Sequence, residues 1–315
     1  MKVRTKAHPE KEISQLEQLN REVAYRAASE GIVLLENEPL SKHTSFRIGG
    51  PARLFALPET VSQLTALVAF ASENELKWTV MGNGSNLLAL DAGFDGLVIR
   101  TPEGKPRWEG NQVTVPAGYS MSRLSAEAAQ RGLAGLTFAQ GIPGTVGGAV
   151  VMNAGAYGGQ IADTLVSTRC ITPDGLCTLT GAEHKLSYRH SVYAEHPGWV
   201  CCEATFCLQP GDREALAAEM ADFAQRRRDK QPLEWPSAGS TFKRPEGYFA
   251  GKLIEDAGLK GFTVGGAQVS EKHAGFVINK GGATCADVLN LMEAVSDKVY
   301  AQFGVRLEPE VKILK

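Results

Sequence analysis

The sequence predicts a mixed α and β protein built from several substructures that share interfaces. Its 315 residues exceed the usual size of a single hydrophobic core. Short segments rich in β-branched and aromatic residues alternate with amphipathic helical patterns, and two glycine-rich loops interrupt them. These observations together predict α/β units with room for a ligand between them.

The first 38 residues predict a surface helix or a partly mobile arm, to which we assign no chemistry. They are rich in charged side chains, and a weak helical repeat runs through Ile13, Leu16, Leu19 and Val23.

Residues 39–110 predict a small α/β unit. A helix is expected over 60–74, because Thr60 is a suitable N-cap and the apolar residues after it keep a helical period. The expected strands of this unit are 52–56, 78–81 and 96–100.

Residues 111–232 predict a second unit that is rich in strands. The Asp174-Gly175 pair predicts a hairpin turn. Pro232 and Pro236 follow the last predicted helix and indicate a domain boundary. The expected strands are 112–116, 166–172, 177–180 and 199–208, and the expected helices are 121–131 and 212–230.

Residues 233–315 predict a compact α+β unit. Its last segment is expected to be a strand, in which alternation would place Glu308 and Glu310 on the same face. The expected helices are 248–257 and 285–303, and the expected strands are 263–269, 276–279 and 306–314.

Composition excludes several classes of function. The formal net charge is -2 and the pI is about 6.3, so no overall positive field exists to hold nucleic acid or an anionic membrane. No long apolar stretch or secretory signal is present, and we expect a cytoplasmic protein. The six cysteines lack a CxxC pair and are expected to be reduced core residues. The histidines show no metal-ligand spacing, so no metal site is expected.

Two glycine-rich loops carry the clearest functional signal. The first, GNGSNLL at 82–88, follows an apolar strand-like segment, and the second, GIPGTVGGAVVMNAGAYGG, spans 141–159. Loops of this kind let main-chain N–H groups converge on a pyrophosphate, although tight packing between two strands is the alternative. Neither loop has the GxGxxG pattern, and no GxxxxGK[ST] motif occurs, which argues against a simple dinucleotide-binding or triphosphatase fold.

Seven motifs in order carry a resemblance to a known family. They are FRIGG at 46–50, the two glycine-rich loops, YRHSVY at 188–193, PSAGSTFKRP at 236–245, GLKGFTVGGAQVSEKHAGFVIN at 258–279 and LEPEV at 307–311. On these motifs the chain resembles the UDP-N-acetylenolpyruvoylglucosamine reductase (MurB) family over about residues 39–313. Few residues separate Arg189 from Pro197, so the resemblance is to the shorter, type II-like form.

The resemblance implies an α+β fold of the vanillyl-alcohol-oxidase-like FAD-binding type. Residues 1–38 would then be an N-terminal arm or helix, 39–110 and 111–232 two α/β FAD-binding subdomains, and 233–315 a substrate-binding domain. It also implies a flavoprotein oxidoreductase that uses NADPH as co-substrate and reduces UDP-N-acetylglucosamine enolpyruvate to UDP-N-acetylmuramate. This reaction serves peptidoglycan synthesis, and through it cell wall biogenesis, cell shape and cell division.

Three residues match the family's catalytic positions. Arg189 matches its carboxylate-binding arginine, Ser240 its proton donor and Glu310 its acidic residue. A guanidinium suits a carboxylate, whereas a serine hydroxyl protonates only a strongly basic carbon. Without the resemblance, Arg189 would be read as a surface turn residue and Ser240 as a turn or N-cap residue. Glu308 is the alternative to Glu310, and only the alignment separates them.

The resemblance also implies the ligand contacts. No residue of the long loop resembles a covalent flavin attachment site, so the FAD should be non-covalent, and we expect a monomer. Lys230, Lys243 and His273 are candidates for the uridine diphosphate side of the substrate, although a solvated helix end is the alternative for Lys230. The candidate FAD contacts are Arg47, Gly82, Asn83, Gly84, Ser85, Asn86, Gly141, Ile142, Pro143, Gly144, Thr145, Gly147, Gly148, Asn153, Ala154 and Gly155.

Two other functions remain open at this point. An oxidase of small alcohols or hydroxy acids with the same flavin fold could use the same loops, but would have no use for a carbon-protonating serine beside an arginine. A non-catalytic nucleotide-sugar binding protein would keep the basic groups without needing a flavin cradle. The colour of the purified protein separates the last alternative from the other two.

Overall fold

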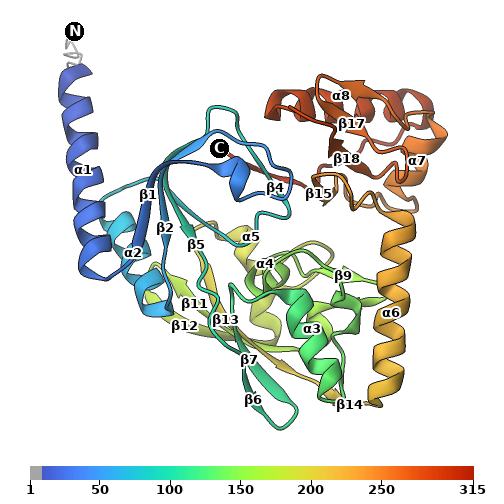
Figure 1. The fold of residues 1–315 in the computed structure, drawn as a ribbon, viewed down its shortest axis with the longest axis horizontal. Helices are drawn as coiled ribbons and strands as arrows, with labels where there is room; N and C mark the ends of the chain where they lie inside the picture. Colours follow the sequence, from blue (N-terminus) through green and yellow to red (C-terminus); the bar gives the residue numbers. More distant parts are fainter. Residues whose placement is uncertain (1–8) are drawn as a thin grey trace.

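The computed structural model describes residues 9–315, and along 9–16 it describes the main chain alone. Figure 1 shows three regions that each contain a sheet: one beside the N-terminal helix, one in the middle of the chain, and a C-terminal region at the end of a long connecting helix. Each region contains a buried apolar cluster, and two of these clusters extend into a neighbouring region.

The first region is a four-stranded sheet with helices on one side. The strand order is β1-β2-β5-β3, in which β1 is antiparallel to β2 and the other pairs are parallel. The predicted helix at 60–74 is confirmed, and Thr60 and Gln63 form a capping box at its start. The elements are α1 (Pro9–Ser29), β1 (Val33–Pro39), η1 (Leu40–Lys42), β2 (Pro51–Leu57), α2 (Val61–Glu73), β3 (Trp78–Met81), β4 (Leu87–Ala89) and β5 (Phe94–Arg100).

The segment before residue 39 contributes to this region. Within α1, Val23 and Ala27 are buried in the same apolar cluster as Leu64 and Leu67 of α2. The chain then continues as β1, an edge strand of the sheet, which the sequence pattern did not predict. The helix expected in the N-terminal segment is therefore present, and it packs on the first region.

The second region is a five-stranded antiparallel sheet in the order β12-β11-β13-β7-β6. Thr172 pairs with Gly175, which confirms the predicted hairpin turn. Its elements are β6 (Arg107–Glu109), β7 (Gln112–Pro116), α3 (Met121–Gln130), β8 (Leu133–Ala134), η2 (Thr137–Ala139), α4 (Val146–Val151), β9 (Gly155–Ala156), β10 (Gly159–Gln160), η3 (Ile161–Asp163), β11 (Leu165–Thr172), β12 (Gly175–Thr180), η4 (Gly181–His184), α5 (Val192–Glu195), β13 (Val200–Cys207) and β14 (Gln209–Pro210).

The long helix α6 (Arg213–Lys230) leads to the C-terminal region, as Figure 1 shows. There a four-stranded sheet in the order β15-β18-β17-β16 packs against α8, whose buried face includes Val288, Leu291, Val295 and Val299. The elements are β15 (Ser237–Ser240), α7 (Ala250–Asp256), β16 (Thr263–Val264), β17 (Ala267–Val269), β18 (Phe276–Asn279), α8 (Cys285–Phe303) and β19 (Lys312–Leu314).

Two predicted strands of this region are wrong in extent. Residues 263–269 form two short strands that pair with each other, because Gly265 adopts a φ of 53° and turns the chain. The predicted strand at 306–314 is reduced to β19, which leaves the C-terminal sheet and pairs in parallel with β4 of the first region. Before it, the chain makes only an isolated antiparallel bridge between Pro309 and Phe242.

The six cysteines are free thiols, and Cys170, Cys201, Cys202 and Cys285 are buried. Among residues 9–315, no helix has both the length and the apolar character needed to span a bilayer. Among residues 17–315, whose side chains the structure describes, no group of three or more His, Cys, Asp or Glu side chains is placed to hold a metal ion.

Candidate active site

The two glycine-rich loops lie against each other. A Cβ atom on Gly82 would lie 2.3 Å from Oγ1 of Thr145, and one on Gly144 would lie 3.2 Å from Oγ of Ser85. Only residues without side chains allow the two loops to approach this closely. The loops predicted from the sequence as parts of one site are therefore neighbours in space.

The first loop offers unpaired main-chain donors. Within residues 9–315, none of the N–H groups of residues 82–86 donates to a protein acceptor. A run of free amides is costly unless a ligand or water accepts from it, and such a run fits the phosphate oxygens of a dinucleotide. The loop therefore fits the diphosphate of FAD.

The second loop differs from the first, because several of its main-chain N–H groups already donate hydrogen bonds to the protein. Gly141 donates to Ser122 at 3.0 Å, Gly147 to the carbonyl of Ala117 at 2.8 Å, and Gly148 to the Thr145 hydroxyl at 3.3 Å. These bonds set the shape of the loop and the start of α4. Among the described residues, this loop offers a close surface for a ligand more than it offers free donors.

Arg189 occupies a strained turn. Residues 187–190 form a tight turn, here called the arginine turn, in which Ser187 and His190 exchange two main-chain hydrogen bonds. Arg189 has a φ of 55°, which non-glycine residues seldom adopt and which recurs at functional sites. Its Nε donates to Oε1 of Glu310 at 2.7 Å, and its Nη2 donates to the carbonyl of Gly155 at 3.4 Å.

Glu310 and Glu308 have different surroundings, so the expectation that alternation puts them on one face is wrong. The side chain of Glu310 is 13% exposed and pairs with Arg189, whereas that of Glu308 is 70% exposed and pairs with Lys243. The segment is not in a strand at these positions, and therefore does not alternate. Burial raises the pKa of Glu310 above its ordinary value, although Arg189, Lys243 and Lys312 oppose the shift.

The first loop also holds the main chain around Glu310. The Asn86 amide donates to the carbonyl of Glu310 at 3.2 Å, and the Asn86 carbonyl accepts from the N–H of Lys312 at 2.9 Å. From the other side, the N–H of Glu310 donates to the carbonyl of Thr241 at 2.8 Å. Glu310 is thus fixed between the first and the C-terminal regions.

Ser240 lies at the end of β15, where the pairing with β18 is irregular. The register shifts between Ser237 and Ser240, and such a bulge redirects a side chain. In residues 9–315, no side-chain or main-chain group forms a hydrogen bond with the Ser240 hydroxyl. The hydroxyl is therefore available to a ligand.

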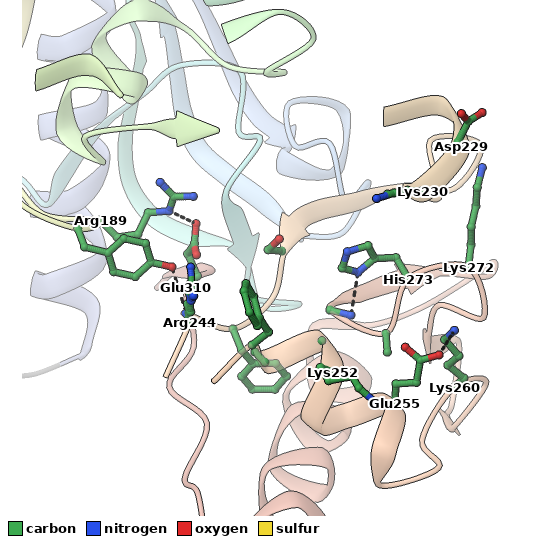
Figure 2. Close-up of a pocket in the computed structure, with 18 residues that line it drawn as sticks. Arg189, Asp229, Lys230, Arg244, Lys252, Glu255, Lys260, Lys272, His273 and Glu310 are labelled. Atoms are coloured by element: carbon green, nitrogen blue, oxygen red, sulfur yellow. Dashed lines mark hydrogen bonds and ion pairs between the residues drawn. The ribbon is translucent and has the colours of Figure 1, made fainter. Parts of the chain in front are cut away.

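Arg189, Ser240 and Glu310 share one cavity of about 460 Å³ between the second and the C-terminal regions. Figure 2 shows Arg189 and Glu310 on one side of it, and Lys230, Lys272 and His273 on the other. Its wall carries six Lys or Arg side chains and three Asp or Glu side chains, which favours an anionic ligand. The cavity contains all three residues that the resemblance selected as catalytic.

Two of the three candidate residues for the uridine diphosphate line the cavity, and the third does not. Lys230 and His273 line the cavity, and Lys243 lies outside its wall with its ammonium group on Glu308. Nδ1 of His273 accepts a hydrogen bond from the N–H of Gly275 at 3.0 Å. Burial lowers the pKa of His273, and Lys260 and Lys230 lower it further, whereas a main-chain hydrogen bond and Glu255 oppose the shift.

Other candidate cofactor contacts have protein partners. Asn83 accepts a hydrogen bond from Arg100 at 3.0 Å, and the carbonyl of Gly155 accepts one from Arg189 at 3.4 Å. Arg47 is exposed and has a φ of 55°. The side chain of Asn153 is buried and makes all its hydrogen bonds to protein, so it leaves only its main chain for a cofactor.

Several cavity residues were not found from the sequence. The adjacent motifs YRHSVY and PSAGSTFKRP offered a signal for two of them, Tyr188 and Arg244. The Tyr188 hydroxyl accepts the N–H of Arg244 at 3.1 Å and so joins the two regions that form the cavity. The residues missed are Tyr188, Asp229, Phe242, Arg244, Phe249, Ala250, Gly251, Lys252, Glu255, Lys260, Lys272, Ala274 and Gly275.

Comparisons with known proteins find relatives that match most of the chain. Residues 231–314 match the family model of the UDP-N-acetylenolpyruvoylglucosamine reductase C-terminal domain, and residues 52–181 match an FAD binding domain. A UDP-N-acetylenolpyruvoylglucosamine reductase of Agathobacter rectalis is 51% identical over 296 residues, which cover 89% of this chain and 94% of that protein. One of Alkaliphilus oremlandii is 45% identical over 297 residues, which cover 92% and 97%.

A solved structure is also similar. The UDP-N-acetylenolpyruvylglucosamine reductase of Thermus caldophilus superimposes with a TM-score of 0.76 and 32% sequence identity. The match covers 90% of this chain and 99% of that one. The similarity therefore extends over all three regions.

Proposed function

The chain belongs to the UDP-N-acetylenolpyruvoylglucosamine reductase family, and from this premise we infer how its residues carry out the reaction. It is an FAD-dependent oxidoreductase that uses NADPH to reduce UDP-N-acetylglucosamine enolpyruvate to UDP-N-acetylmuramate in peptidoglycan precursor synthesis. Its fold is the expected α+β fold, with a vanillyl-alcohol-oxidase-like FAD-binding part and a C-terminal reductase domain.

The observation that carries the assignment of residues is the shared cavity. It brings a fixed guanidinium, a free hydroxyl and a buried carboxyl to one place beside the glycine-rich loops. Reduction of an enolpyruvyl ether needs a proton donor for one vinyl carbon and positive charge near the adjoining carboxylate. These three groups supply both.

FAD supplies the transfer of a hydride between NADPH and the substrate when it is bound. The free N–H groups of 82–86 are proposed to hold its diphosphate, and residues 141–148 to line it. Ala154 and Gly155 are proposed to contact FAD near its isoalloxazine ring. Arg47 and Asn153 remain proposals, the latter through its main chain.

Arg189 is proposed to bind the substrate carboxylate. Its planar fork matches two carboxylate oxygens and keeps its charge at all working pH values. Nε donates to Glu310 and Nη2 makes a long hydrogen bond to the carbonyl of Gly155, so among the described residues Nη1 is the guanidinium nitrogen left for the carboxylate. The guanidinium therefore stabilises negative charge that develops on the carboxylate during reduction.

Ser240 is proposed to protonate the substrate carbon, and Glu310 to support this step. A serine hydroxyl is a weak acid, so it acts only on a strongly basic carbon within hydrogen-bond reach. The raised pKa of Glu310 lets this carboxyl keep a proton at higher pH than an exposed glutamate does. Lys230, Lys243 and His273 are proposed to serve the uridine diphosphate.

We also propose the wider setting. The separate sheets support the division into residues 1–38, 39–110, 111–232 and 233–315, with two exceptions: β1 belongs to the first sheet, and β19 pairs with β4 of the first region. One chain supplies both walls of the cavity, which supports a monomer. We propose that the enzyme works in the cytoplasm, and that its loss affects cell shape and division.

The substitution S240A tests the role of Ser240. We expect NADPH to bleach the flavin absorbance at the wild-type rate, and the substrate to restore it at least about tenfold more slowly. S237A, on the same strand but outside the cavity wall, is the control. Equal slowing of both half-reactions in S240A would contradict the assignment.

A further inference from the structure

We propose that Asn153 is a positioning residue that holds Arg189 in its working conformation, by tying the arginine turn to the end of α4. The proposal rests on the proposed role of Arg189 and adds a residue whose side chain touches neither substrate nor cofactor. It follows from the hydrogen bonds of Asn153 and from the backbone conformation of two residues.

The arginine turn needs support from outside itself. Arg189 is held at a φ of 55°, and the turn is closed by only two hydrogen bonds between Ser187 and His190. A non-glycine residue stays in this region only when its surroundings impose it. The side chain of Arg189 lines the cavity and is 20% exposed.

Asn153 supplies that support from the end of the second glycine-rich loop. It is 2% exposed, and its Nδ2 donates to the carbonyl of Ser187 at 3.0 Å. The same nitrogen donates to Oε1 of Gln160 at 3.1 Å, and Oδ1 accepts from the N–H of Ala162 at 3.0 Å. The amide is therefore fully used, and one of its bonds ends on the first residue of the turn.

A second hydrogen bond joins the same two segments. The hydroxyl of Ser191, which is fully buried, donates to the carbonyl of Val151 at 2.7 Å. The arginine turn is thus attached on both flanks to the last residues of α4 and the loop after it. Arg189 consequently keeps its place relative to Gly155, whose carbonyl it contacts.

Asparagine is well suited to this position. The position needs two donors and one acceptor in a buried place, which an amide provides and a carboxylate or hydroxyl does not. It also has a φ of 39°, and asparagine tolerates positive φ better than most other non-glycine residues. Both demands select the same residue.

The test is N153D, which keeps the shape and the acceptor for Ala162 but loses both donated bonds. We expect FAD content and the NADPH half-reaction within about twofold of wild type, and reoxidation by the substrate at least about tenfold slower. Q160A is the matched control. It removes the other acceptor of Asn153 at an exposed residue, where water replaces it, and should leave reoxidation within about twofold of wild type.

A pH profile separates positioning from general weakening. Arg189, Lys243 and Lys312 are the charged groups that lower the pKa of Glu310 against its burial. If N153D releases Arg189, the pKa of Glu310 rises further, and the limb of the reoxidation profile that Glu310 governs moves to higher pH. A variant that is only less stable keeps the wild-type limb.

The controls make the outcomes distinct. R189K should slow reoxidation, and wild-type reoxidation by R189K would reject the proposed role of Arg189 itself. If R189K reoxidises slowly but N153D keeps the wild-type reoxidation rate and pH profile, only the positioning role of Asn153 is overturned. If N153D does not fold as a flavoprotein, N153G replaces it, because glycine tolerates the φ of 39° and loses the same donated bonds without adding a buried charge. An unchanged oxidative half-reaction and pH profile in N153G would overturn the proposal.

Discussion

At the scale of single residues, the pair Glu308 and Glu310 shows how surroundings decide a role. Both are glutamates two positions apart, yet one faces solvent and the other is buried against a guanidinium. Desolvation raises the pKa of Glu310 because it disfavours the charged form. Of the two, Glu310 lines the cavity and has the raised pKa, as its proposed role requires.

The substitutions E310Q and E308Q test this difference. E310Q should lower kcat by about a hundredfold or more, the usual range for loss of a group that takes part in proton transfer. E308Q, which removes only an exposed ion pair with Lys243, should stay within about threefold of wild type. Steady-state kinetics of the two purified variants decide it, and a larger loss in E308Q would show that the wrong glutamate was assigned.

At the scale of elements, β19 matters because it connects distant parts of the chain. It leaves the C-terminal region and pairs in parallel with β4, which directly follows the first glycine-rich loop. The N–H of Lys312 donates to the carbonyl of Asn86 at 2.9 Å. This short strand thus sets the position of Glu310 relative to the first glycine-rich loop.

The substitution K312P tests the strand. Proline removes the donated hydrogen bond and restricts the backbone, so we expect kcat to fall at least about tenfold and the free energy of unfolding to fall by roughly 1–3 kcal/mol. K312A keeps the N–H and should have nearly wild-type kcat and stability, because the side chain is exposed. Kinetics and urea unfolding measure both effects. An active K312P would mean that β19 does not position Glu310.

Some elements followed directly from local patterns. The helix α8 has the predicted bounds of 285–303, since Thr284 caps it and its apolar residues keep one face buried. The strand predicted at 306–314 failed because alternating apolar residues also arise where a chain crosses between two regions. Leu307 and Val311 are buried there without a sheet partner.

At the scale of the whole molecule, FAD is expected to be part of the stable structure. Its proposed site joins loops from the first and second regions, and free N–H groups line it. A ligand that binds only the folded chain adds stability according to its concentration and affinity, about 2.7 kcal/mol at a hundredfold excess over Kd.

Removal of FAD tests this expectation. The purified protein should be yellow, and the apoprotein should unfold at a lower temperature than the holoprotein, with Tm restored by added FAD and less by riboflavin, which lacks the diphosphate. Thermal unfolding and the flavin absorbance measure it. A colourless protein whose Tm does not respond to FAD would favour a nucleotide-sugar binding protein instead.

The sequence by itself determined the local features of this protein. Caps, apolar periods and glycine-rich turns depend on neighbouring residues, so they predicted most helices and strands and both loops, and the order of the motifs indicated the family. Only the tertiary structure decided which distant groups meet. It paired Arg189 with Glu310, which is 121 residues away in the sequence, whereas Glu308 pairs with Lys243. It also showed that the side-chain amide of Asn153 donates to the main chain of Ser187. The physical reason is that burial and long-range hydrogen bonds depend on how the three regions pack, which no local pattern encodes.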